Sequence, residues 1–200
     1  SPRRAPPPPP PPANPRPTLL LLRCSLISSL GCSDVDSNGH IDIPEGTVLA
    51  TNQFRSCNSL TSITLPGSVT VIPDDAFNSC KKLKSVTMGT NVETIGSSTF
   101  EGCTNLQSLT LPDSVRKIGF RAFAHCYSLE SITIPNGVTE ISNEAFKKCY
   151  NLQSVSLGEN VIGINGDAFH KCKSLTSIKL PKSLERIEDS AFRQCSLKSL

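Results

Sequence analysis

Two sets of residues in this 200-residue chain have the types and spacing for binding chemistry. The first set is a run of oxygen donors with one imidazole, at Asp34, Asp36, Asn38, His40, Asp42 and Glu45. The oxygen donors stand at positions 1, 3, 5, 9 and 12 of a twelve-residue segment, with glycine at position 6 and isoleucine at position 8. This is the spacing of a calcium loop held between two helices. The pattern by itself predicts a calcium site.

The sequence around this segment favours a second interpretation. Residues 41–44 repeat the strand phrase of residues 63–66, at an offset of 22. An EF-hand loop also needs an exiting helix, and Gly46 followed by β-branched Val48 is a poor start for one. We therefore expect an N-terminal cap strand near 40–44, and calcium binding is the alternative.

The second set is a pair of hydroxyl columns that recur every 23 residues. One column is Ser62, Ser85, Ser108, Ser131, Ser154 and Ser177, and the other is Thr64, Thr87, Thr110, Thr133, Ser156 and Lys179. The two columns flank one apolar residue, so in a strand they share the opposite face. They predict either a weak, avid binding surface for glycans or protein strands, or a solvated sheet with good β propensity.

A 23-residue repeat has to position these columns. Seven phenylalanines keep this period, each followed three residues later by a cysteine: Phe54, Phe77, Phe100, Phe123, Phe146, Phe169 and Phe192. One unit, residues 60–82, reads as a short strand ended by proline, then a return arm with Val-x-x-Ile and Ala-Phe-x-x-Cys. We expect one helical or 3₁₀ turn in that arm. A unit this short buries its apolar side only by stacking on its neighbours.

The phenylalanine and cysteine columns predict the core. Aromatic rings at equal height in successive coils stack on each other. The seven column cysteines are expected to be small buried thiols bonded weakly to backbone carbonyls, because parallel Cβ vectors are poor geometry for disulfides. Cys24 and Cys32 lie outside the column and can pair or stay reduced. The absence of a C-x-x-C pair argues against a zinc site.

The repeat pattern is C-x-x-L-x-S-[IVL]-x-[LI]-P-x-x-V-x-x-I-x-x-x-A-F, and residues 103–123 match it at every fixed position. It resembles the BspA-like branch of the leucine-rich repeat family over about residues 40–200. The copy at 80–100 departs mildly, at Met88, Gly89 and Thr99. The resemblance implies a repeat solenoid with 23-residue units, short parallel strands on the concave face, and turn or 3₁₀ return arms. It also implies a non-catalytic surface or secreted protein.

Composition divides the chain and excludes some functions. Residues 1–33 are expected to be a disordered proline-rich and short apolar segment, with a secretion signal as an alternative, and 34–200 a solenoid of about seven repeats. The apolar stretch 18–30 is too short to span a bilayer. A net charge of +3 argues against a nucleic-acid binder. Two tyrosines and no tryptophan make an aromatic platform unexpected.

The remaining residues give no catalytic pattern. His40, His125 and His170 fall in different units, and the period implies no Ser-His-acid arrangement. A basic edge is expected towards the C-terminus, formed by Lys147, Lys148, His170, Lys171 and Arg193. We expect a protein that mediates protein–protein or cell-surface adhesion interactions with a protein or glycan surface. The alternatives are a structural spacer or stalk, and a calcium-dependent module using residues 34–45.

Overall fold

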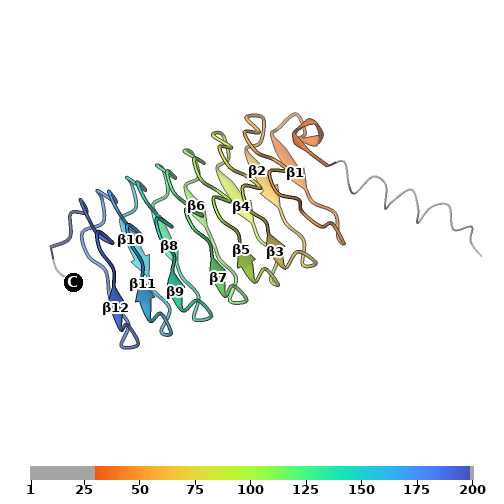
Figure 1. The fold of residues 1–200 in the computed structure, drawn as a ribbon. Helices are drawn as coiled ribbons and strands as arrows, with labels where there is room; N and C mark the ends of the chain where they lie inside the picture. Colours follow the sequence, from red (N-terminus) through yellow and green to blue (C-terminus); the bar gives the residue numbers. More distant parts are fainter. Residues whose placement is uncertain (1–29, 199–200) are drawn as a thin grey trace, which may run out of the picture.

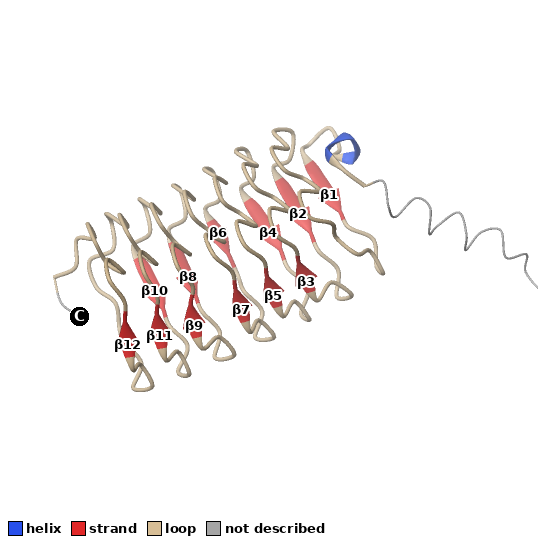
Figure 2. Cartoon of the chain, in the orientation of Figure 1, coloured by secondary structure: helices blue, strands red, loops and turns tan. Residues whose placement is uncertain are grey.

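The computed structural model describes residues 30–198, in which the chain winds into a row of stacked coils (Figure 1). The proline-rich stretch and most of the apolar stretch expected within residues 1–33 lie outside the described residues. Six 23-residue coils begin at residue 60 and follow a cap coil. Figure 2 shows two rows of short strands joined by loops, and the one helix within residues 30–198 is a 3₁₀ turn, η1 (Cys32–Asp34), at the N-terminal end.

The first row consists of the predicted strands. Its members are β1 (His40–Asp42), β2 (Ser62–Thr64), β4 (Ser85–Thr87), β6 (Ser108–Leu109), β8 (Ser131–Thr133) and β10 (Ser154–Ser156). All pairs are parallel, and between the 23-residue coils each residue faces the one 23 positions on, as in Ile63 with Val86. Ile41 pairs with Ile63, so the predicted cap strand is confirmed. The bridge between Ser156 and Lys179 extends the row into the last coil.

A second row of strands lies in the return arms, where the sequence predicted only turns. It comprises β3 (Val71–Ile72), β5 (Thr94–Ile95), β7 (Lys117–Ile118), β9 (Glu140–Ile141), β11 (Gly163–Ile164) and β12 (Arg186–Ile187). Each strand has only two residues, and in most of them one side chain is buried. Two residues are too few for a period-2 alternation to be recognised in a sequence.

The arm around each phenylalanine forms consecutive turns rather than the helical turn expected there. Asp75 and Ser79, on either side of Phe77, have φ angles of 56° and 60°. This left-handed conformation directs alternate N–H groups along the stack, and the amides of Asp75, Phe77 and Ser79 donate to carbonyls of the next coil at 2.9, 2.9 and 2.7 Å. These hydrogen bonds offset a conformational cost of about 1–2 kcal/mol per left-handed residue.

The predicted aromatic stack is confirmed. All seven phenylalanine rings pack face to face with their neighbours, with centroids 5.3 to 5.5 Å apart and planes within 10°. Beside them, the thiols from Cys80 to Cys195 each donate to the phenylalanine carbonyl of the preceding coil, at 2.9 to 3.2 Å. Each coil is therefore tied to the next through ring packing, thiol bonds and backbone bonds.

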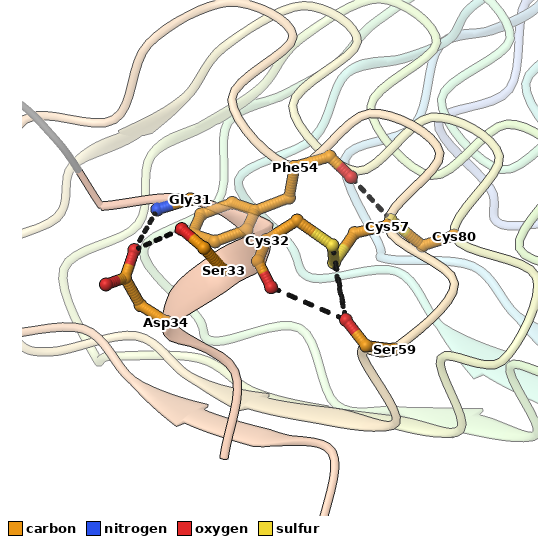
Figure 3. The surroundings of a disulfide bond; sticks show 8 residues. All are labelled: Gly31, Cys32, Ser33, Asp34, Phe54, Cys57, Ser59 and Cys80. Atoms are coloured by element: carbon orange, nitrogen blue, oxygen red, sulfur yellow. Dashed lines mark hydrogen bonds between the residues drawn. A yellow bond between two sulfur atoms is a disulfide. The ribbon is translucent and has the colours of Figure 1, made fainter. Parts of the chain in front are cut away.

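The first cysteine of the column departs from the prediction. Cys57 forms a disulfide with Cys32, across a sequence separation of 25 (Figure 3). The expectation of a thiol was wrong here because Cys32 approaches from η1, so the argument from parallel side chains in stacked coils does not apply. The Gln53 side chain also donates to the Leu30 carbonyl at 3.0 Å. Residues 30–33 thus lie against the cap coil and cover the exposed end of the stack.

Candidate functional site

The hydroxyl columns gather on one side of the solenoid, which we call the strand face. Ser62 pairs with Ser85 and Thr64 with Thr87, while the residues between them turn into the core. Ser62 and Thr64 are half-buried, and the other ten column residues are exposed. All twelve residues lie on one surface, as the sequence predicted. Lys179 is the single charged side chain among these twelve.

Two residues of the cap strand continue these columns at the N-terminal end. His40 lies in register with Ser62, and Asp42 with Thr64. The His40 ring joins both columns, with Nδ1 2.7 Å from Ser62 Oγ and Nε2 3.0 Å from Asp42 Oδ1. Hydrogen bonds from His40 and then Thr64 lower the pKa of Asp42. The strand face thus begins with a polar cluster whose members come from two coils.

This cluster brings together a serine, a histidine and an acid, which the sequence did not indicate. The period could not reveal it, because His40 and Asp42 belong to the cap and not to the repeat. Nucleophilic acyl transfer also needs donors aimed at the developing oxyanion. Here the amides of Thr61 and Ser62 both donate to the Gly39 carbonyl, at 2.6 and 3.1 Å. Asp42 is exposed to solvent, so the geometry supports a hydrogen-bonded edge of the sheet.

The carboxylates of the calcium-loop pattern bond to separate backbone groups. Asp34 accepts a hydrogen bond from the Gly31 amide at 2.8 Å. Asp36 accepts from two amides of its own loop, both at 2.8 Å, and the one from His40 is the main reason why its pKa is lowered. Glu45 reaches the next coil and accepts from the amides of residues 67 and 68, both at 3.2 Å. These three carboxylates therefore bond to three different segments of the chain, and the fourth, Asp42, bonds to the His40 ring.

Asn38 lies in the turn before β1, where its backbone carbonyl accepts the Thr61 hydroxyl at 3.0 Å. Within residues 30–198, no three or more His, Cys, Asp or Glu side chains come together in a way that could hold a metal ion. Calcium binding through residues 34–45 stays a prediction, and in this conformation it would require the cap strand to rearrange.

The arm side carries a chain of ion pairs across three coils. Arg121 contacts Glu144 at 2.7 Å, Lys147 lies 3.2 Å from Glu144 and 3.0 Å from Asp167, and His170 lies 3.3 Å from Asp167. Burial raises the pKa of both carboxyls, but hydrogen bonds from Arg121 and Lys147 to Glu144, and from Lys147 to Asp167, outweigh it and lower both values. Of the predicted basic edge, Lys147 is therefore paired with acids, and the His170 ring lies beside Asp167.

The two tyrosines meet on the same side of the molecule. Tyr127 and Tyr150 stack with centroids 5.0 Å apart and planes at 14°. His125 Nδ1 lies 3.1 Å from the Tyr127 hydroxyl, and the Lys173 ammonium lies 5.3 Å from the Tyr150 centroid. Counting tyrosines had argued against an aromatic platform. The signal that was missed is their spacing, since both follow a column phenylalanine by four residues.

The repeat sequence of this chain matches that of a known family. A family model described as a BspA type leucine-rich repeat region matches in six copies, over residues 47–169 and 94–200. The chain belongs to the BspA-type leucine-rich repeat family. A search of curated proteins finds no significant match. The BspA-type family is consistent with a protein-binding or surface repeat protein, and its members are generally not enzymes.

Solved structures of bacterial leucine-rich repeat proteins share this BspA-type solenoid. A leucine-rich repeat protein from T. pallidum is 31% identical, with 76% of this chain and 73% of that chain covered and a TM-score of 0.71. One from Eubacterium ventriosum is 28% identical, with 82% and 45% covered and a TM-score of 0.76. A leucine-rich cell surface protein from Faecalibacterium prausnitzii is 34% identical, with 80% and 46% covered and a TM-score of 0.68. The match spans less than half the length of the last two proteins.

None of the helices within the described part of this BspA-type chain is long and apolar enough to cross a membrane.

Proposed function

We propose that this chain is a non-catalytic recognition module that presents its strand face to a protein or glycan surface outside the cell. One observation carries the proposal: two columns of small hydroxyl side chains lie in register along two parallel sheets, β1-β2-β4-β6 and β8-β10, whose backbones are fixed by ladder bonds between coils. Each hydroxyl can donate or accept a hydrogen bond, so a repetitive partner can meet many weak contacts at a fixed spacing of about 4.8 Å. Weak contacts that act together give avidity.

Two further points support an extracellular location. The Cys32–Cys57 disulfide fits an oxidising compartment, where such bonds form and persist. The similar protein from Faecalibacterium prausnitzii is described as a cell surface protein. An adhesion role would use the strand face directly, whereas a spacer or stalk would use only the length of the solenoid.

The test is a pair of double variants. Lys179 already occupies the threonine column, so Thr87→Lys with Thr133→Lys should keep the sheet while adding two charges to the strand face. The control, Thr70→Lys with Thr139→Lys, adds the same charge at exposed positions in the return arms. Binding is measured on an array of purified glycans and extracellular-matrix proteins. We expect at least a tenfold loss in the strand-face variant alone. Equal binding by all three proteins would place the contact outside the strand face, and no binding by the wild type would support the spacer.

Calcium dependence is tested separately, by calorimetric titration of the whole chain with calcium chloride. Micromolar binding that is lost when Asp34 and Asp36 are both changed to alanine would support the alternative, a calcium-regulated module. No heat of binding would leave residues 34–45 as a cap strand.

A further inference from the structure

An open groove of about 370 Å³ crosses the arm side of the first coils, away from the strand face. It lies where two columns of arm residues have small side chains in one coil. Two positions after each phenylalanine, the column runs Ser79, Gly102, His125, and four positions after, it runs Lys81, Thr104, Tyr127. Glycine and threonine in the middle coil leave space between the lysine on one side and the two ring side chains on the other.

Tyr127 forms an aromatic wall of this groove. Tyr150, from the coil that follows, covers one face of its ring. The equivalent position in the preceding coil is the small Thr104, which lines the groove together with Tyr127, and the His125 ring lies tilted against Tyr127 with centroids 5.8 Å apart. Tyr150 is in turn covered by the Lys173 ammonium. The tyrosine pair is thus a short stack whose Tyr127 end borders the groove.

Polar groups surround the rest of the groove. Its lining includes Arg55, Asn78 and Glu101, and the Glu101 side chain is 22% exposed with Arg121 at 3.9 Å. Burial and then the nearby Lys148 ammonium lower the pKa of His125, which favours the neutral ring. A neutral imidazole both donates and accepts hydrogen bonds. The site therefore combines one flat apolar surface with donors and acceptors of both charges.

We propose that this groove binds a saccharide, with one pyranose ring against Tyr127 and its hydroxyls bonded to the polar lining. A pyranose presents a face of C–H bonds with partial positive charge, which complements the negative face of an aromatic ring. Its hydroxyls need donors and acceptors around the edge, as this lining supplies. A proline-rich peptide is the weaker fit, because such segments bind in grooves lined by several aromatic side chains and this lining holds a single tyrosine. The size lies at the low end for ligand sites.

The sharpest test fills the groove without disturbing the coil. Thr104→Tyr places a tyrosine where the next two coils already have one, so it should extend the stack and preserve the melting temperature. Thr104→Ser is the matched control and leaves the groove open. Tyr127→Ala removes the aromatic wall, whereas Tyr127→Phe retains it. Binding is measured on an array of neutral and carboxylated oligosaccharides and with a proline-rich peptide, followed by calorimetric titration with the best ligand.

We expect at least a tenfold weaker affinity for Thr104→Tyr and Tyr127→Ala, and less than a threefold change for Thr104→Ser and Tyr127→Phe. The proposal is overturned if the wild type binds no saccharide, if it binds a proline-rich peptide instead, or if Thr104→Tyr binds normally. The strand-face variant, Thr87→Lys with Thr133→Lys, separates the two proposals. If the strand-face variant abolishes saccharide binding and Thr104→Tyr retains it, the saccharide binds to the strand face.

Discussion

Two kinds of column run along this solenoid, and they use the repeat in opposite ways. The inner columns hold the same residue in every coil, phenylalanine in one and cysteine in the other. The arm columns beside the ring stack change from coil to coil, and the position after each phenylalanine reads Arg55, Asn78, Glu101, Ala124, Lys147, His170 and Arg193, of which Asn78 and Ala124 are buried. A stack of rings works only when neighbours match, whereas a surface side chain needs only a compatible neighbour. The constant columns therefore determine the architecture, and the variable columns make the arm of each coil different from the next.

The largest test of this contrast is Phe123→Ala. The ring packs against Phe100 on one side and Phe146 on the other, so its loss leaves a cavity between two stacked rings. We expect the free energy of unfolding, measured in denaturant, to be about 3–5 kcal/mol lower than that of the wild type. Phe192→Ala is the control, because that half-buried ring has one stacking neighbour and should cost less. A loss below about 1 kcal/mol for Phe123→Ala would contradict the stacking account.

The second test concerns the end of the constant cysteine column, where a disulfide replaces the thiol bond. Cys32→Ser opens a loop of 25 residues, and the chain-entropy account gives about 3.5 kcal/mol for such a loop. Because a solenoid can fray coil by coil, the loss should be local to the cap and first coil. Hydrogen exchange should speed up in residues 39–65 and stay unchanged in the last coils.

The control for the disulfide is Cys195→Ser, which removes a thiol at the opposite end of the column. A reducing agent should lower the stability of the wild type and of this control, and should have no effect on Cys32→Ser. If the reducing agent destabilises all three proteins equally, the cap does not depend on the disulfide.

The third test compares thiols within one column. Burial raises the pKa of Cys80 to about 11 and of Cys149 to about 12. The contact with the Cys172 thiol instead lowers the pKa of Cys195, which is partly exposed in the last coil. Only the thiolate is alkylated, so iodoacetamide at pH 8 should label Cys195 at least a hundredfold faster than the buried thiols. Peptide mass spectrometry measures this, and equal labelling of Cys126 would show that the column opens readily.

The sequence predicts the constant columns well because their physics is periodic. The 23-residue spacing leads directly to stacked coils, the ring stack and the thiol bonds, and the offset of 22 at residues 41–44 predicts the cap strand. The second strand row was missed because two residues give no alternation. The left-handed residues were missed because their types vary: Asp75, Arg121 and Glu144 share one conformation, and nothing in a single side chain encodes it.

The non-periodic features were harder to predict because each depends on one encounter in space. Cys32 meets Cys57 only after η1 has folded back, and His40 meets Ser62 only through the register of β1 with β2. The tyrosine stack is intermediate between the periodic and the non-periodic features. Its spacing is visible in the sequence, but a composition count conceals it. Variable columns should therefore be compared coil by coil, as the constant ones are.

The smallest expected effect is for Glu144→Gln in the ion-pair chain of the variable columns. The folded-state pKa of Glu144 is lowered by Arg121 and Lys147 in spite of burial, so the charged carboxylate stabilises the fold above the unfolded pKa of about 4.3. That contribution is lost as pH falls through the lower folded pKa. At pH 7 we expect the variant to lose about 0.5–1 kcal/mol, the usual range for partly exposed pairs.

Stability measured against pH checks this expectation. The difference between wild type and Glu144→Gln should shrink steadily below about pH 4. Glu130→Gln, at an exposed position in the same coil, is the control and should show almost no difference at any pH. If Glu144→Gln lowers the free energy of unfolding by several kcal/mol, the arm surface is as constrained as the ring stack. The two kinds of column would then not differ in the way described above. A small loss would mean that these positions can exchange residues at little cost in stability, which is what a surface that acquires different ligands requires.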